Sequence, residues 1–188
     1  LFEKNADQLM APASMSKMMT AYMAFERLRD SSISLEDTFV VSENAWRKGG
    51  AKSGGSTMFL EPGSRVRIES LLRGIIIQSG NDASIVMAEG LAGSEQGLAD
   101  EMTARGKELG MLNSTFKNAT GWPNEEHRTT ARDLSVLARR TITDFPQFYH
   151  YYSERQFSYN GIRQGNRNPL LGKEMGADGL KTGHTQES

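Results

Sequence analysis

The order of helical and strand-like patterns along the chain constrains its fold more than any other feature of the sequence. Helical patterns dominate from about residue 14 to residue 150, whereas strand-like patterns gather toward the two ends. No internal repeat and no low-complexity linker interrupts the sequence. This order predicts one domain with an α/β (α+β) fold, in which a helical lobe packs against an antiparallel sheet. Residues 1–13 and 151–188 are expected to contribute the strands.

Five segments carry helical patterns: residues 15–28, 68–78, 82–91, 95–109 and a segment that begins after Thr130. In the first, methionine and aromatic residues recur at roughly helical spacing, which we interpret as core packing. The second is strongly apolar and is expected to be buried. Asp82 and Thr130 are suitable N-caps for the helices that they precede. Gly110 stands where a C-terminal cap is favoured.

Strand and loop patterns complete the predicted secondary structure. β-Branched and aromatic residues at 38–41 and alternating residues at 156–159 predict two strands. Gly161 is expected to turn the chain after the second of these. Residues 179–184 predict a further strand, and the stretch 45–57, rich in Gly, Lys and Ser, predicts an exposed loop.

The composition excludes several classes of function. Hydrophobic residues make up 37% and charged residues 24% of the 188 residues, an ordinary globular balance. The net charge of −1 gives the chain no general attraction to nucleic acid. The absence of cysteine excludes thiol nucleophiles, thiolate metal sites and disulfides. His127, His150 and His184 have no metal-ligand spacing, so we expect neither a metal nor a cofactor.

Both ends of the sequence look cut. The chain begins with Leu1 instead of methionine, shows no signal peptide, and stops directly after a predicted strand. No apolar run approaches the length of a membrane span. We therefore expect a partial domain that contacts a membrane only through segments outside this chain.

Ser14 and Lys17 form a Ser-x-x-Lys motif where the first helix is predicted to begin. This spacing places both side chains on one helix face, one turn apart. A neutral lysine can activate a serine nucleophile in place of a histidine. The start of a helix also exposes backbone N–H groups and the positive end of its dipole, which would stabilise an oxyanion at Ser14. Ser114 and Lys117 repeat the spacing in a predicted loop, and we interpret that copy as accidental.

Two further motifs follow along the chain. Ser79 and Asn81 form a Ser-x-Asn motif at the predicted break between two helices, where such residues are often only caps. Lys181-Thr182-Gly183 is the one triplet of its kind in the sequence. Ser-x-x-Lys, Ser-x-Asn and Lys-Thr-Gly, in this order, form the combination typical of β-lactamases and penicillin-binding proteins.

The sequence resembles the penicillin-binding D,D-carboxypeptidases, peptidase family S11, over essentially the whole chain. The matching segments are residues 13–20, 58–63, 77–83, 166–168 with 170–171, and 178–185. The resemblance implies a β-lactamase/transpeptidase-like fold and a serine-type D-alanyl-D-alanine carboxypeptidase that trims peptidoglycan stem peptides. It also implies covalent inhibition by β-lactam antibiotics, and a role in cell-wall synthesis and cell shape in the periplasm, outside the cytoplasmic membrane.

The resemblance implies a role for each motif residue. Ser14 would attack the carbonyl between the two D-alanines and form an acyl-enzyme. Lys17, kept neutral by burial and by the cation of Lys181, would accept the proton of Ser14. Ser79 would pass a proton toward the leaving D-alanine. The residues expected to bind substrate are Asn81, Lys181, Thr182, Gly183 and His184. The backbone N–H groups of Ser14 and His184 would form an oxyanion hole.

Several parts of the family's structure are expected to lie outside this chain. They are the first sheet strands, the strands and helix after Lys-Thr-Gly with a carboxylate-binding arginine, a C-terminal all-β domain and a membrane-binding helix. The resemblance therefore implies an incomplete sheet here. We expect stability, activity and membrane attachment to depend on those parts.

Two other interpretations stay open at this point. A class A β-lactamase has the same motifs and fold but needs a Glu-x-x-Leu-Asn segment that activates water. The nearest match, Glu108 to Asn113, has one residue too many and comes too early. The second alternative is a non-catalytic peptidoglycan-binding or inert fragment. A fluorescent penicillin distinguishes these two interpretations from the carboxypeptidase. A carboxypeptidase would release it slowly, a β-lactamase would turn it over rapidly, and an inert fragment would not bind it.

Overall fold

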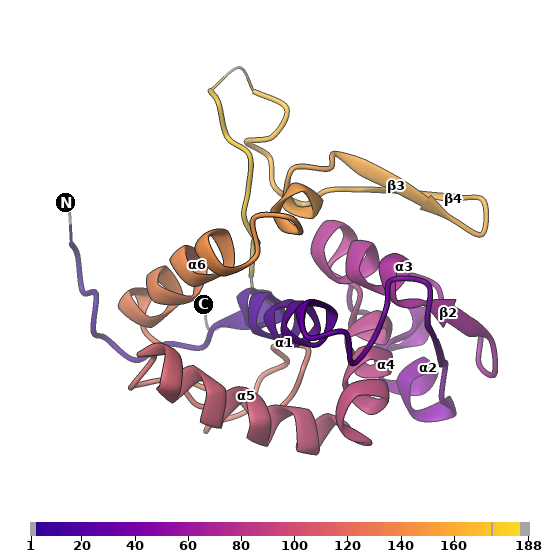
Figure 1. Cartoon of the computed structure of the whole chain (residues 1–188), viewed down its shortest axis with the longest axis horizontal. Helices are drawn as coiled ribbons and strands as arrows, with labels where there is room; N and C mark the ends of the chain where they lie inside the picture. The colour runs from indigo at the N-terminus through magenta and orange to yellow at the C-terminus, as the bar shows by residue number, and fades with distance from the viewer. Residues whose placement is uncertain (1–2, 174, 185–188) are drawn as a thin grey trace.

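The computed structural model describes residues 3–173 and 175–184, and these residues contain six α-helices, of which α1 is the central one. The helices are α1 (Lys17–Arg29), α2 (Glu43–Gly49), α3 (Ile68–Arg73), α4 (Asn81–Ala92), α5 (Glu95–Leu109) and α6 (Ala131–Asp144). Shorter turns are η1 (Ala13–Ser16), η2 (Ala51–Ser53) and η4 (Tyr149–Tyr152), which are 3-10 helices, and η3 (Gly74–Gln78), which is a π-helix. Helix α1 lies between α5 and α6 on one side and α3 and α4 on the other (Figure 1).

The strands form two small antiparallel sheets. Strand β1 (Thr38–Val40) pairs with β2 (Arg65–Arg67), and β3 (Gln156–Tyr159) pairs with β4 (Ile162–Gly165). Gly161 turns the second hairpin with φ +76°, as predicted. The predicted class, helices combined with antiparallel strands, is confirmed.

The predictions for the two ends of the chain are only partly correct. Residues 179–184 form no strand, because a strand needs a neighbouring backbone and none of the described strands lies beside this segment. Residues 3–13 contribute one isolated bridge, between Met10 and Thr129, and no strand. The β3–β4 hairpin is therefore the sheet that the C-terminal part of the described chain provides.

The prediction of a loop at 45–57 is wrong for residues 45–49 and 51–53, which lie in α2 and η2, and correct for residues 54–57, which form no helix or strand. Helix α2 runs into this stretch, because the Ser42 hydroxyl caps it by accepting a hydrogen bond from the Ala45 N–H at 2.9 Å. Asp82 is also not an N-cap: it lies inside the first turn of α4, whose N-cap is Gly80. The predicted caps Gly110 and Thr130 are confirmed at the ends of α5 and α6.

The core forms around α1, which is buried from Lys17 to Phe25. Met18, Met19 and Met23 pack in this core, as the helical spacing predicted. Tyr22 is fully buried, and its ring meets that of Phe145 edge to face, with centroids 4.8 Å apart. These contacts hold α1 rigidly in the middle of the helical lobe.

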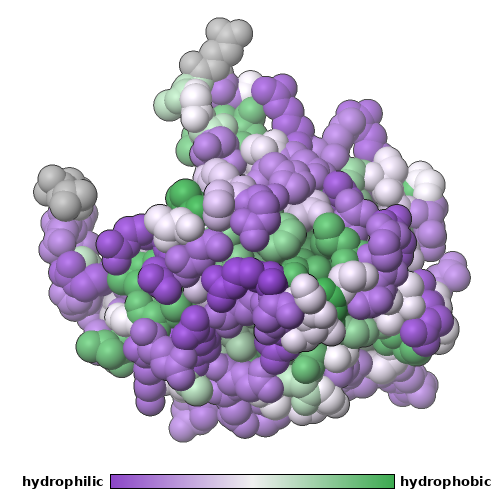
Figure 2. Space-filling model, in the orientation of Figure 1, coloured by the Kyte–Doolittle hydropathy of each residue, from purple (hydrophilic) through white to green (hydrophobic). Residues whose placement is uncertain are grey.

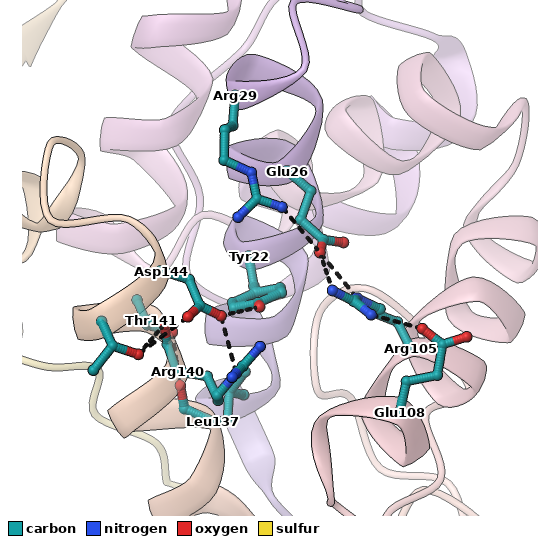
Figure 3. A network of polar contacts seen from close by, with 10 residues as sticks. Tyr22, Glu26, Arg29, Arg105, Glu108, Leu137, Arg140, Thr141 and Asp144 are labelled. Carbon is teal, nitrogen blue, oxygen red and sulfur yellow. Dashed lines mark hydrogen bonds and ion pairs between the residues drawn. The ribbon is translucent and has the colours of Figure 1, made fainter.

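Polar contacts connect the C-terminal half of α1 to helices α5 and α6 (Figure 3). The Tyr22 hydroxyl donates to Asp144 of α6 at 2.7 Å. Glu26 pairs with Arg105 of α5 at 2.7 Å, and Arg105 also pairs with Glu108 at 2.6 Å. The helix that carries Lys17 is thus tied to both α5 and α6.

The surface in Figure 2 is largely hydrophilic, with hydrophobic residues gathered mainly near the middle of the view. Across residues 3–173 and 175–184, no helix combines the length and the apolar character needed to cross a bilayer.

Candidate active site

Ser14 and Lys17 meet at the junction of η1 and α1. Ser14 lies within the 3-10 turn and is partly exposed, whereas Lys17 is the first residue of α1 and is completely buried. The Lys17 Nζ and the Ser14 Oγ lie 3.1 Å apart. The motif spacing predicted this proximity, and the structure brings the two groups within hydrogen-bonding distance.

The Lys17 amine has two other partners, and both accept hydrogen bonds. Nζ lies 2.8 Å from the Asn81 Oδ1 and 2.5 Å from the backbone carbonyl oxygen of Thr120. A neutral amine has two N–H groups and one lone pair. Because a carbonyl oxygen only accepts, Asn81 and Thr120 take both N–H groups of the neutral amine. The lone pair is then left to face the hydroxyl of Ser14.

The environment of Lys17 favours that neutral form. Burial is the main cause that holds the pKa of the Lys17 amine well below its usual range, and the Lys181 cation adds to this effect. The carboxylates of Asp82 and Glu95 act in the opposite direction. The amine is therefore suited to accept a proton from a neighbouring hydroxyl.

Ser79 sits where the π-helical turn η3 ends, in a left-handed backbone conformation with φ +64°. A non-glycine residue adopts this conformation only where its surroundings require it, and such residues gather at functional sites. Its buried Oγ has no hydrogen-bond partner among the described residues.

The Lys-Thr-Gly segment faces Ser14 across a cleft. A cavity of about 440 Å³ is lined by Ser14, Ser56, Ser79, Arg167, Pro169, Thr182, Gly183 and His184. Gly183 lies directly against η1, since a Cβ added to it would stand 2.9 Å from the backbone nitrogen of Met15. One site therefore brings together residues from distant parts of the sequence: Ser14, Ser79, Thr182, Gly183 and His184.

Lys181 is buried beside this cleft, where its Nζ donates to the Thr182 carbonyl at 2.8 Å. Burial, followed by the neighbouring Arg167 cation, lowers the pKa of Lys181 to about 7. Arg167 lines the first cavity, whereas the buried Lys181 lines neither that cavity nor the second one described below.

A second cavity, of about 330 Å³, opens on the other side of Ser14. It is lined by Ser14, Gly54, Gly55, Ser56, Asn81, Thr120, Gly121, Trp122, Pro123 and His184. Ser14 and His184 line both cavities, so the serine hydroxyl stands in the middle of an extended cleft.

Sequence reasoning assigned no role to Arg167 or Thr120. Arg167 lies in a segment that resembles the family, and this was the signal that could have directed attention to it. Thr120 contributes its backbone carbonyl, which no side-chain pattern reports. Only the folding of residues 118–122 over Lys17 makes this carbonyl part of the site.

Gly121 allows that segment to approach Ser14. Its φ is +82°, and an added Cβ would stand 1.9 Å from the carbonyl oxygen of Ala13 and 3.0 Å from the backbone nitrogen of Ser14. We expect Gly121→Ala to displace Ser14 and to slow its acylation by a penicillin roughly a hundredfold, since a displacement of about 1 Å has such effects. Stopped-flow acylation measures this rate. A rate within about twofold of the unmodified protein would contradict the proposed contact. Gly63→Ala is the control, because Gly63 has a similar φ of +80° and open space around it.

The second Ser-x-x-Lys copy is structural. The Ser114 hydroxyl donates to Asp133 at 2.7 Å, and Lys117 pairs with Glu126 at 2.9 Å. These separate partners are consistent with the interpretation of this copy as accidental, which stays a prediction. Among the described residues, no group of three or more His, Asp or Glu side chains is arranged to hold a metal ion.

Comparison with known sequences points to one family. Residues 1–188 match peptidase S11, described as D-alanyl-D-alanine carboxypeptidase. The D-alanyl-D-alanine carboxypeptidase DacC of Escherichia coli (strain K12) is 42% identical over 187 residues, which cover 98% of this chain and 47% of DacC. DacF of Bacillus subtilis (strain 168) is 39% identical over 193 residues, which cover 100% of this chain and 48% of DacF. The chain spans about half the length of the curated relatives it matches.

The solved structures that resemble this chain include proteins with the same kinds of name. Penicillin binding protein 5 from Haemophilus influenzae superposes with a TM-score of 0.94 at 36% identity, over 98% of this chain and 54% of that protein. The D-alanyl-D-alanine carboxypeptidase DacD from Francisella tularensis gives 0.94 at 31% identity, over 100% of this chain and 57% of DacD. The Streptomyces K15 DD-transpeptidase, at 24% identity and a TM-score of 0.89, shares the fold.

Proposed function

The chain belongs to the peptidase S11 family, and on this basis we propose that it acts as a serine-type D-alanyl-D-alanine carboxypeptidase on peptidoglycan stem peptides. The observation that carries the proposal is the contact of the buried Lys17 amine with Ser14 and Asn81, beside a cleft that Ser79, Thr182 and His184 line. We also propose that residues 1–188 form the central part of one catalytic domain, with residues 14–150 as its helical lobe.

Acylation begins when the Ser14 Oγ attacks the carbonyl carbon between the two D-alanines. Its proton moves to the Lys17 lone pair, which the two acceptors described above direct toward it. The carbonyl oxygen becomes an oxyanion that the backbone N–H groups of Ser14 and His184 stabilise. The C–N bond then breaks, and the Ser79 hydroxyl gives its proton to the amine of the leaving D-alanine while it takes up the proton that Lys17 accepted from Ser14. Water subsequently hydrolyses the ester on Ser14 and regenerates the hydroxyl.

The ends of the cleft fit the two ends of such a substrate. Thr182 and Arg167 line the first cavity and would face the terminal carboxylate, with the charge of Lys181 buried beside them. Asn81 lines the second cavity and would hold the amide of the preceding residue. A β-lactam offers the same carboxylate and a reactive amide, so it acylates Ser14. Its ring-opened remnant stays attached and blocks the water. This makes the drugs covalent inhibitors.

The location of the activity follows from the substrate. Peptidoglycan lies outside the cytoplasmic membrane, so we propose an extracytoplasmic, periplasmic enzyme that takes part in cell-wall synthesis, cell shape and proteolysis of stem peptides. Attachment to the membrane would come through segments outside this chain.

The pH dependence of acylation is expected to be bell-shaped. Lys17 must be neutral to accept a proton, so the rate falls as pH drops through its lowered pKa. Lys181 must be charged to hold a carboxylate, so kcat/KM falls as pH rises above the Lys181 pKa of about 7. A bound carboxylate raises this pKa, so the alkaline limb of kcat lies at higher pH than that of kcat/KM. Rates of D-alanine release between pH 4 and pH 10 test this.

Lys181→Met is the matched variant for the pH experiment. It removes the titrating cation, so the alkaline limb should disappear. It also removes a charge that lowers the Lys17 pKa, so the acidic limb should move to higher pH. An acidic limb that stays in place would contradict the coupling between the two lysines.

Mass spectrometry of the protein after penicillin treatment tests the function itself. A long-lived adduct on Ser14, together with release of D-alanine from a stem pentapeptide, supports the carboxypeptidase. Rapid turnover of the penicillin would instead support a β-lactamase, although Glu108, the nearest acid in a suitable sequence, is paired with Arg105. Absence of both adduct and turnover would support a non-catalytic protein.

A further inference from the structure

Asn118 organises the segment that passes over Lys17. Its Oδ1 accepts three hydrogen bonds, from the Thr120 N–H at 3.2 Å, the Thr120 hydroxyl at 3.1 Å and the Gly121 N–H at 2.7 Å. Its Nδ2 donates to the Trp122 carbonyl at 3.0 Å. One side chain thus folds residues 118–122 into a closed turn of the kind that asparagine favours.

This turn sets the direction of the Thr120 carbonyl. The peptide group before it is held from outside the turn, since the Thr20 hydroxyl of α1 donates to the Ala119 carbonyl at 2.8 Å. The N–H groups of Thr120 and Gly121 flank the Thr120 carbonyl along the backbone, and both are bonded to Asn118. The carbonyl oxygen that results lies 2.5 Å from the Lys17 Nζ.

We propose that Asn118 is a positioning residue for proton transfer: by fixing the Thr120 carbonyl, it directs the lone pair of the Lys17 amine at Ser14. This inference rests on the proposed function, because it assigns Lys17 as the base. Asn118 lines neither of the two cavities at Ser14. It acts through one acceptor, and without that acceptor one N–H of the neutral amine is free to point at Ser14 in place of the lone pair.

The charged groups that face Lys17 come from three parts of the fold. They are Lys181 from the Lys-Thr-Gly segment, Asp82 from α4 and Glu95 from α5. Asn118 is uncharged, so its replacement by alanine leaves these charges unchanged. If Asn118→Ala changes the rate of acylation, the cause is then a changed orientation of the Lys17 amine and not a changed charge near it.

The test compares Asn118→Ala with Asn124→Ala. Asn124 belongs to the same loop and makes the same kind of turn, in which its Oδ1 accepts from the Glu126 N–H at 2.9 Å, but it has no bond to residues 118–122. Acylation of Ser14 by a penicillin is followed from pH 4 to pH 10. We expect Asn118→Ala to lower the plateau of the rate at least about tenfold and Asn124→Ala to leave it unchanged.

The position of the acidic limb distinguishes a misaligned Lys17 amine from a site that has become open to water. If the variant only opened the site to water, the Lys17 pKa would rise toward its usual value, and the acidic limb would move to higher pH. Misalignment lowers the plateau and produces no upward shift of the limb. Asn118→Asp should restore the turn and the plateau, because aspartate also forms such turns. Its added negative charge should raise the Lys17 pKa and move the limb to higher pH.

A measurement that needs no reaction decides the inference independently of the proposed function. Crystal structures should show the Thr120 oxygen beyond hydrogen-bonding distance of the Lys17 Nζ in Asn118→Ala and within it in Asn124→Ala. An unmodified protein that is never acylated would overturn the proposed function, and these structures would still test the role of Asn118. An unchanged Thr120 contact, an unchanged plateau, or an equal loss in Asn124→Ala would overturn that role.

Discussion

Replacement of Ser14 by alanine is expected to abolish covalent labelling by a fluorescent penicillin, with a loss of at least about a thousandfold. The reason is chemical: the Ser14 Oγ is the hydroxyl within 3.1 Å of the Lys17 Nζ, and the amine has no other nucleophile to activate there. Gel fluorescence after incubation, and the intact mass of the protein, measure the adduct. Circular dichroism checks that the variant is folded, which we expect because Ser14 is partly exposed.

Ser114→Ala is the matched control, since Ser114 begins the other Ser-x-x-Lys sequence. Its hydroxyl is buried and bonded to Asp133 at 2.7 Å and Thr129 at 2.8 Å. We expect this variant to lose about 1–3 kcal/mol of stability and to keep its labelling. Labelling that survives in Ser14→Ala and disappears in Ser114→Ala would refute the assignment of the nucleophile.

Replacement of Asp82 by alanine is expected to produce the largest loss of stability. The carboxylate is fully buried and accepts from Thr57 Oγ1 at 2.7 Å, Met58 N at 2.8 Å, Leu60 N at 3.1 Å and Ala83 N at 2.9 Å. Without it, several buried donors lose their partner, and each costs about 1–3 kcal/mol. We expect the free energy of unfolding to fall by at least about 3 kcal/mol, measured by urea denaturation.

Asp37→Ala is the control for this prediction. Asp37 also accepts a backbone hydrogen bond, from the Ser34 N–H at 2.7 Å, but it lies at the surface, where water replaces the lost partner. Its expected cost is below about 1 kcal/mol. Equal losses in the two variants would contradict the view that burial of the Asp82 carboxylate determines its effect. Because Asp82 follows Asn81 at the start of α4, its loss should also displace a partner of Lys17.

Local chemistry explains what could be read from the sequence. The helix at 95–109, its cap at Gly110 and the cap at Thr130 depend on residues within one or two turns, and all agree with the structure. The proximity of Ser14 and Lys17 is equally local, because a spacing of three residues places them one turn apart. The order of the three motifs indicated the family, and the comparison over residues 1–188 agrees.

The tertiary structure decided what depends on contacts between distant residues. The expected strand at 179–184 has strand-like residues but no strand beside it among the described residues. Residues 45–49 of the expected loop are helical, because the Ser42 cap that precedes them starts α2. The Thr120 carbonyl reaches Lys17 across 103 positions of sequence. By itself the sequence determined which side chains can do the chemistry. Only folding decided which backbone groups orient them and how far burial shifts their pKa, because both depend on neighbours that are remote along the chain.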